Sequence, residues 1–80
     1  MNSFQEIDVH GMNRQQAFTS IDAKLRRADA SVYQLRVIHR YRSATVLRDA
    51  IRAHYKGHPM VKRIELGLNP GETDLILRDL

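Results

Sequence analysis

Two short segments in which apolar residues alternate with polar ones constrain the fold most, because a helix-like segment lies between them. Ile7 and Val9 alternate with charged residues in the first segment, and Leu35 and Val37 flank an arginine in the second. A period of two is typical of β-strands with one face in a core. The intervening residues 14–28 carry apolar side chains at spacings of three and four, which predict an amphipathic helix. This order predicts a right-handed parallel βαβ unit.

The remainder of the chain predicts a second helix and two further strands. The apolar stripe of the second helix includes His54, which we expect in the core, and the turn NPGET is short enough to imply an antiparallel hairpin. We therefore predict one domain over residues 1–80, an α/β protein of order βαβαββ: a two-layer α/β sandwich with a mixed four-stranded sheet and two helices. The expected elements are strands at 6–10, 34–39, 61–68 and 74–80 and helices at 14–28 and 45–56.

The composition narrows the class of protein. The chain has no cysteine, which excludes a disulfide scaffold, a thiolate zinc site and a cysteine nucleophile. No apolar run approaches the roughly 20 residues that a membrane-spanning helix needs. We expect a cytoplasmic protein that does not associate with a membrane.

Positive charge is concentrated in the middle of the sequence. Of the 13 Lys and Arg residues, eleven fall between positions 24 and 63, where only two acidic residues occur. Most of these cations are arginines, whose planar guanidinium suits bidentate contacts with phosphate. The pattern favours a nucleic-acid partner, DNA or RNA, although a charged surface that only maintains solubility is the alternative.

Polar residues collect where the first two strands end. Because neighbouring parallel strands end at the same edge of a sheet, we expect His10 and His39 to lie close together there. Asp8 shares a strand face with His10, and the N-terminus of the second helix supplies free N–H groups that attract anions. The candidate catalytic residues are Asp8, His10 and His39, and the candidate nucleic-acid-binding residues are Gly11, Arg40, Tyr41, Arg42, Ser43 and Arg48.

This combination suits phosphodiester chemistry. One histidine would take a proton from the attacking oxygen and the other would protonate the leaving oxygen, while arginines stabilise the developing charge. A structural role for Asp8 in the turn at Gly11 is equally open, and a metal site of two histidines and one carboxylate is a less favoured alternative. We expect no cofactor, and a divalent metal is the less favoured alternative because arginines surround the ligands.

Several motifs together resemble the Smr (small MutS-related) domain family. The stretch IDVHG is similar to the family's L-D-x-H-G opening, followed in register by LRRAD, a strand ending in VIH, the helix entry TVLR and the closing NPGETDLIL. The resemblance implies a fold like the C-terminal half of a bacterial initiation factor. It also implies nucleic-acid binding and, in several members, nicking of DNA or cleavage of RNA. The family's first motif falls on Asp8, His10 and Gly11, and the histidine of its second on His39.

The second motif departs from the family pattern. Family members usually show H-G-x-G with a later glycine, whereas this chain has HRYRSA, so Arg40 and Arg42 replace glycines and Ala44 replaces the last. Glycines there permit positive φ and close approach to phosphate. An arginine must use other dihedrals or carry strain of about 1–3 kcal/mol. Either guanidinium groups replace backbone N–H groups in holding phosphate, or the loop binds without cleaving.

These observations favour a nucleic-acid-binding Smr-like domain, with nicking endonuclease or ribonuclease activity as its chemistry. The alternatives are a non-catalytic module that binds DNA, RNA or the ribosome, and a protein-interaction domain whose basic surface meets an acidic partner. The sequence does not choose between DNA and RNA and gives no oligomeric state.

Overall fold

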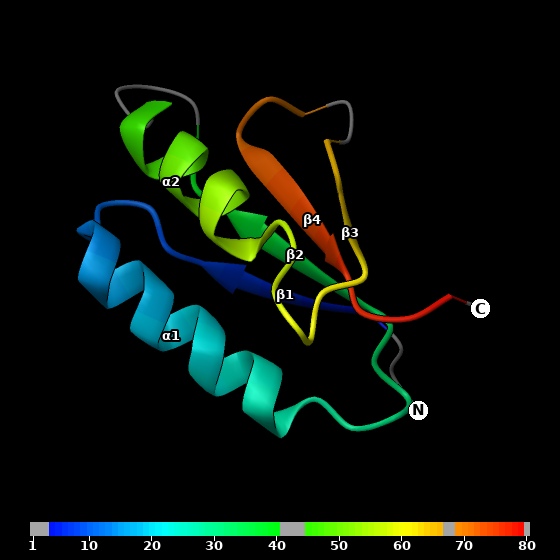
Figure 1. Cartoon of the computed structure of the whole chain (residues 1–80). Coiled ribbons are helices and arrows are strands. Elements are labelled where there is room, and N and C mark those ends of the chain that lie inside the picture. The colour runs from blue at the N-terminus through cyan, green and yellow to red at the C-terminus, as the bar shows by residue number, and fades with distance from the viewer. Residues whose placement is uncertain (1–3, 41–44, 67–68, 80) are drawn as a thin grey trace.

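The observed elements follow the predicted order βαβαββ. The computed structural model describes residues 4–40, 45–66 and 69–79. Of the helices in these ranges, none is long and apolar enough to cross a membrane. The elements are β1 (Phe4–Asp8), α1 (Arg14–Arg27), β2 (Gln34–Ile38), α2 (Thr45–Tyr55), β3 (Arg63–Glu65) and β4 (Glu72–Ile76) (Figure 1).

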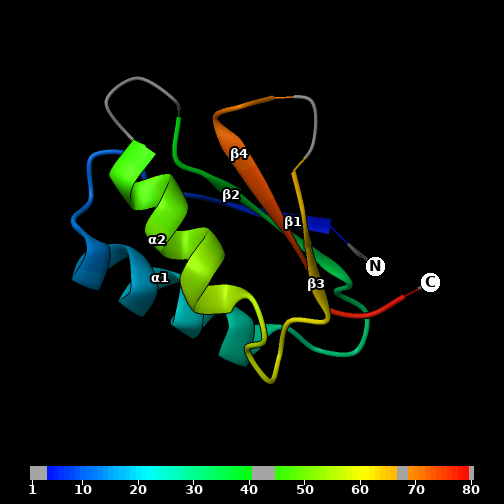
Figure 2. The ribbon, with the colours of Figure 1, turned by 45° about the horizontal axis from the view of Figure 1, so that its top comes forward.

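The four strands form one mixed sheet of order β1-β2-β4-β3. β1 pairs with β2 in parallel, and β4 pairs antiparallel with both β2 and β3. The predicted parallel unit, hairpin and central position of β2 are therefore confirmed. Both helices pack against the same face of the sheet, so the molecule has two layers (Figure 1, Figure 2). We call the face of the sheet away from the helices the open face.

The core lies between the helices and the sheet. Side chains with almost no exposure come from both layers, and their burial removes apolar surface from water, the dominant stabilising term. The α1 stripe agrees with the predicted helical spacing. The fully buried core residues are Val9, Ala17, Ile21, Leu25, Leu35, Val37, Ile51, Tyr55 and Leu75, with Val61 at 5% exposure.

The prediction that His54 belongs to the core is wrong. His54 is exposed, and its ring stacks on that of Phe18 with a centroid distance of 4.1 Å. Tyr55 is buried instead, because it lies four residues after Ile51 on the same helical face. The Tyr55 hydroxyl donates a hydrogen bond of 2.6 Å to Asp22 Oδ1 of α1, which joins the two helices.

Several predicted element boundaries also shift. β1 covers Phe4–Asp8 rather than 6–10, because the Asp8 side chain accepts the N–H of His10 and turns the chain. β4 covers Glu72–Ile76 rather than 74–80, since its pairing with β2 already begins at Glu72. β3 has only three residues, and positions 67, 68 and 80 lie outside the described residues. The start of α1 is as predicted, with Asn13 and Gln16 forming a capping box.

Candidate functional site

The end of β1 presents a carboxylate and an imidazole in direct contact. Asp8 Oδ1 accepts two hydrogen bonds from His10, one from the backbone N–H at 3.0 Å and one from ring Nδ1 at 2.7 Å. The ring hydrogen bond, and then the backbone one, lower the pKa of the Asp8 carboxyl below its ordinary value. Both proposed roles of Asp8, in the turn and in orienting His10, are thus geometrically compatible. Gly11 follows with φ +79°, a conformation that favours glycine.

Arg40 lies on the other side of the same carboxylate. Its Nη2 is 3.5 Å from Asp8 Oδ2, and the Arg40 side chain is 61% exposed. The backbone of Arg40 has φ +59°, the left-handed conformation that favours glycine. Of the two options that the sequence left open for an arginine here, other dihedrals or a strained backbone, the structure shows the strained one. Asp8 holds an imidazole and a guanidinium at one exposed edge.

His39 does not join His10 at this edge, and the expected pair of imidazoles is wrong. The register pairs Ile7 with Val37 and Asp8 with Ile38, so residues 37 and 39 face the helices. His39 is 0% exposed, whereas the side chain of His10 is 54% exposed. The His39 ring is therefore buried between the sheet and the helices, whereas the His10 ring lies in the exposed turn that follows β1.

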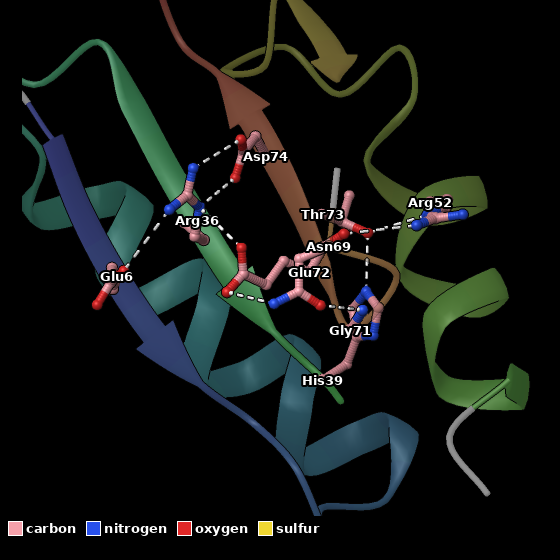
Figure 3. Close-up of polar contacts among 9 residues, drawn as sticks. All are labelled: Glu6, Arg36, His39, Arg52, Asn69, Gly71, Glu72, Thr73 and Asp74. Carbon is pink, nitrogen blue, oxygen red and sulfur yellow. Dashed lines mark hydrogen bonds and ion pairs between the residues drawn. The ribbon is translucent and has the colours of Figure 1, made fainter. Parts of the chain in front are cut away.

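Both nitrogens of the buried His39 ring have partners. Nε2 is 2.8 Å from Thr73 Oγ1 of β4, and Nδ1 is 3.1 Å from the carbonyl oxygen of Arg40. Arg52 of α2 in turn donates from Nε to Thr73 Oγ1 at 2.9 Å (Figure 3). Burial, together with Arg52 and Arg48, lowers the pKa of His39, while its bond to the Arg40 carbonyl opposes this effect.

Sequence reasoning missed Thr73 and Arg52 and misplaced His39. The alternation of Leu35 and Val37 with polar residues continues to His39, and this signal already assigns the histidine to the core face. Thr73 and the buried Leu75 are two residues apart on β4, so they share the face of the sheet that packs against the helices. No sequence pattern indicated Arg52, because its hydrogen bond to Thr73 depends on how α2 packs over the sheet.

The alternative of a metal face is not supported by the geometry. Within residues 4–40, 45–66 and 69–79, no three His, Asp or Glu side chains lie close enough to hold a metal ion together. The proposed third ligand, His39, is buried between the sheet and the helices. The second oxygen of Asp8 meets a guanidinium, which opposes a bound cation.

Two arginines of the basic segment are paired with acidic residues on the open face. Arg36 donates to both carboxylate oxygens of Asp74, at 2.9 and 3.3 Å, and also lies 3.3 Å from Glu72 (Figure 3). Arg63 pairs with Glu65 and Asp79. The positive charges of Arg36 and Arg63 are therefore partly neutralised by acidic residues of the protein itself.

The other predicted binding residues have different positions. Arg48 is in α2, one turn after the helix begins, and its Nε lies 3.1 Å from Asp49 Oδ1. Tyr41, Arg42 and Ser43 lie outside the described residues. Within the described residues, the edge therefore consists of Asp8, His10 and Arg40.

The fold and edge define a small α/β domain with an exposed carboxylate-imidazole-guanidinium group at the ends of parallel strands. The Smr domain family model matches residues 7–71, and the chain belongs to that family. It is also similar to the crystal structure of the Smr domain of Thermus thermophilus MutS2. That likeness has a TM-score of 0.83 and 26% sequence identity, over 94% of this chain and 99% of that chain. A comparison with curated protein sequences finds no match.

Proposed function

We propose that this domain binds the phosphate backbone of DNA or RNA at the edge where β1 and β2 end. The observation that carries the proposal is the exposed group in which Asp8 holds His10 and Arg40 side by side. A guanidinium binds phosphate through parallel N–H donors, and the exposed Arg40 side chain supplies such a group. Membership of the Smr family supports the same kind of partner, because Smr domains generally bind nucleic acids.

The distribution of charge favours this edge over the open face. A phosphate at the open face would have to displace Asp74 and Glu72 from Arg36, and this exchange would leave Asp74, only 6% exposed, without its cation. At the edge, the Arg40 side chain is largely exposed, and its carboxylate partner Asp8 is exposed as well. We therefore infer that the phosphate binds at Arg40.

Phosphodiester cleavage is a second candidate function, and the Asp8–His10 contact favours it. Because a carboxylate only accepts hydrogen bonds, the 2.7 Å contact places the proton of the neutral His10 ring on Nδ1. Nε2 is then unprotonated and able to accept a proton, which is the arrangement of a general base oriented by a carboxylate.

In this mechanism His10 activates the attacking hydroxyl. Nε2 takes its proton while the new O–P bond forms, and Arg40 stabilises the charge on the non-bridging phosphate oxygens. The bond from phosphorus to the leaving oxygen then breaks, and the leaving oxygen takes a proton from water. His39 does not donate that proton, because its ring is fully buried between the sheet and the helices.

Binding is tested by fluorescence anisotropy with labelled single-stranded and duplex DNA and RNA. We expect unlabelled nucleic acid of unrelated sequence to compete, since phosphate contacts are independent of sequence. Arg40→Gln should weaken binding about tenfold, as expected for one lost charge-assisted contact. Absence of binding to all four probes in low salt would contradict the proposal and favour a protein partner.

Cleavage is tested with supercoiled plasmid and structured RNA, in EDTA and in Mg²⁺ or Mn²⁺. His10→Ala and Asp8→Asn should lower the rate by about 10²–10⁴-fold, as expected for a lost general base or its orienting group. Equal cleavage by His10→Ala and the unaltered protein would identify a contaminant. Activity that needs a divalent metal would contradict the metal-free mechanism.

A further inference from the structure

A chain of hydrogen bonds runs from α2 through β4 to the residue that begins the candidate edge. It links Arg52, Thr73, His39 and the carbonyl of Arg40 (Figure 3 labels the first three). His39 and Thr73 are both 0% exposed, so the bond between them forms away from solvent, and the bonds to Arg40 and from Arg52 are partly buried. A buried polar group that lost its partner would incur a desolvation penalty. Each donor and acceptor in this series of hydrogen bonds therefore needs a partner.

The chemistry of the partners fixes the direction of each bond. The Arg40 carbonyl only accepts, so His39 Nδ1 carries the proton and donates. In the neutral ring Nε2 is then an acceptor, and the Thr73 hydroxyl donates to it. Thr73 Oγ1 remains an acceptor for the Nε–H of Arg52. The neutral Nδ1–H tautomer of His39 therefore satisfies every member of the chain.

Arg40 is held in its strained conformation from two directions. The backbone N–H groups of His39 and Arg40 both donate to the carbonyl of Gly71, at 2.9 and 2.8 Å. Gly71 allows this approach, because a Cβ atom at that position would lie 2.9 Å from the Cα of Arg40. The carbonyl of Arg40 is held by His39. A non-glycine residue stays in the left-handed region when its surroundings over-determine it.

We propose that His39 is a positioning residue, which acts through the Arg40 carbonyl to hold the guanidinium of Arg40 at the phosphate-binding edge. This role rests on the proposed function, in which Arg40 contacts phosphate. It replaces the role of proton donor that the sequence suggested for the second histidine. The departure from glycine at position 40 gives the histidine this task, since the arginine needs its backbone conformation enforced.

Two substitutions separate the two nitrogens of His39. His39→Asn keeps an N–H donor at the place of Nδ1, and His39→Gln keeps an acceptor at the place of Nε2 while removing the donor to Arg40. We expect His39→Asn to bind nucleic acid within about twofold of the unaltered protein. His39→Gln should weaken binding about tenfold, as Arg40→Gln does. Equal loss in both variants, or no loss in His39→Gln, would overturn the proposal.

Nuclear magnetic resonance gives a test that does not depend on nucleic acid. Long-range ¹H–¹⁵N spectra of the full chain should show the His39 ring as the Nδ1–H tautomer. The ¹³Cα and ¹³Cβ shifts of Arg40 should report a left-handed backbone in the unaltered protein and in His39→Asn, and its loss in His39→Gln. An Nε2–H tautomer, or a left-handed Arg40 in all three proteins, would overturn the proposal.

The two tests also separate this proposal from the proposed function. If the unaltered protein binds no nucleic acid while the tautomer and the Arg40 shifts behave as expected, the proposed function fails and the positioning of Arg40 by His39 stands. If the protein binds nucleic acid and the Arg40 shifts do not respond to His39→Gln, binding stands and the positioning role fails.

Discussion

At the scale of single residues, the edge depends on one arginine in an unusual backbone conformation and one histidine that is buried. Arg40 has φ +59°, and His39 is packed with both ring nitrogens bonded. The left-handed conformation costs an L-residue about 1–2 kcal/mol, so the protein sacrifices stability at this position. An exposed guanidinium at the edge is the functional gain that we assign to this cost.

Arg40→Gly should raise the stability of the protein and weaken its binding. Glycine relieves the strain of φ +59° but loses more backbone entropy on folding, so we expect the free energy of unfolding to rise by about 0.5–1 kcal/mol. The lost guanidinium should raise the Kd for nucleic acid about tenfold. Urea unfolding and anisotropy measure the two effects. A less stable Arg40→Gly protein would show that the conformation carries little strain.

The stability of the protein should fall as the pH drops below about 6.5, because of His39. Burial and the positive charges of Arg52 and Arg48 lower its pKa in the folded state, with Glu72 and the Arg40 carbonyl opposing them. Between the unfolded pKa of about 6.5 and the lower folded pKa, only the unfolded chain binds the proton. His39 therefore favours folding fully above pH 6.5 and progressively less below it.

The measurement is the urea midpoint at pH 7.5, 6.5 and 5.5. His39→Asn is the matched variant, because it keeps the donor to Arg40 and does not titrate. Its midpoint should depend less on pH than that of the unaltered protein. Parallel curves for the two proteins would show that the folded state accepts a proton on His39 as readily as the unfolded chain.

At the scale of elements, the two helices are joined by polar as well as apolar contacts. The Tyr55 hydroxyl donates to Asp22 at 2.6 Å, and burial followed by this hydrogen bond raises the pKa of Tyr55. α2 also contacts β4 through the bond from Arg52 to Thr73. The position of α2 over the sheet therefore depends on specific partners on both sides.

Tyr55→Phe should lower the free energy of unfolding by about 1.5 kcal/mol, since a hydrogen bond to a carboxylate is lost from a largely buried site. The comparison is made in an Asp22→Ala background, where the acceptor is already absent. There the same substitution should change the free energy of unfolding by much less, which thermal or urea unfolding can measure. Equal losses in both backgrounds would assign the effect to the second acceptor of the hydroxyl, the Phe18 carbonyl oxygen at 3.3 Å, or to packing.

At the scale of the whole molecule, the distribution of charge is more informative than its total. The chain has a formal net charge of +4, yet two arginines of its basic segment, Arg36 and Arg63, are paired with acids on the open face. The cations that are consecutive in the sequence are divided in the structure between the helices, the open face and the edge at Arg40. Phosphate binding should therefore depend on few of them.

The dependence of binding on salt distinguishes these cations. Arg40→Gln should reduce the slope of log K against log salt concentration by about 0.7–0.9, the value for one lost phosphate contact. Arg63→Gln removes the same charge from a residue paired with Glu65 and Asp79, and should leave the slope unchanged. A reduced slope for Arg63→Gln with an unchanged slope for Arg40→Gln would place the nucleic acid on the open face.

The sequence by itself determined the order of the elements, the parallel βαβ unit, the hairpin and the central strand. Local periodicity and turn residues carry this information, because a period of two or of 3.6 is present in any segment that must bury one face. The proximity of Asp8 and His10 was also within its reach because they are only two residues apart, although the contact forms in the turn after β1 and not on the strand. The motifs further indicated the Smr family.

Only the tertiary structure decided which side chains meet across segments. The register of β1 against β2 sends His39 toward α2 and leaves His10 with Asp8. The packing of α2 selects Tyr55 over His54 for the core and brings Arg52 to Thr73. The approach of Gly71 to Arg40 enforces the left-handed arginine. These are non-local contacts, and their geometry depends on how the layers pack together rather than on any one segment.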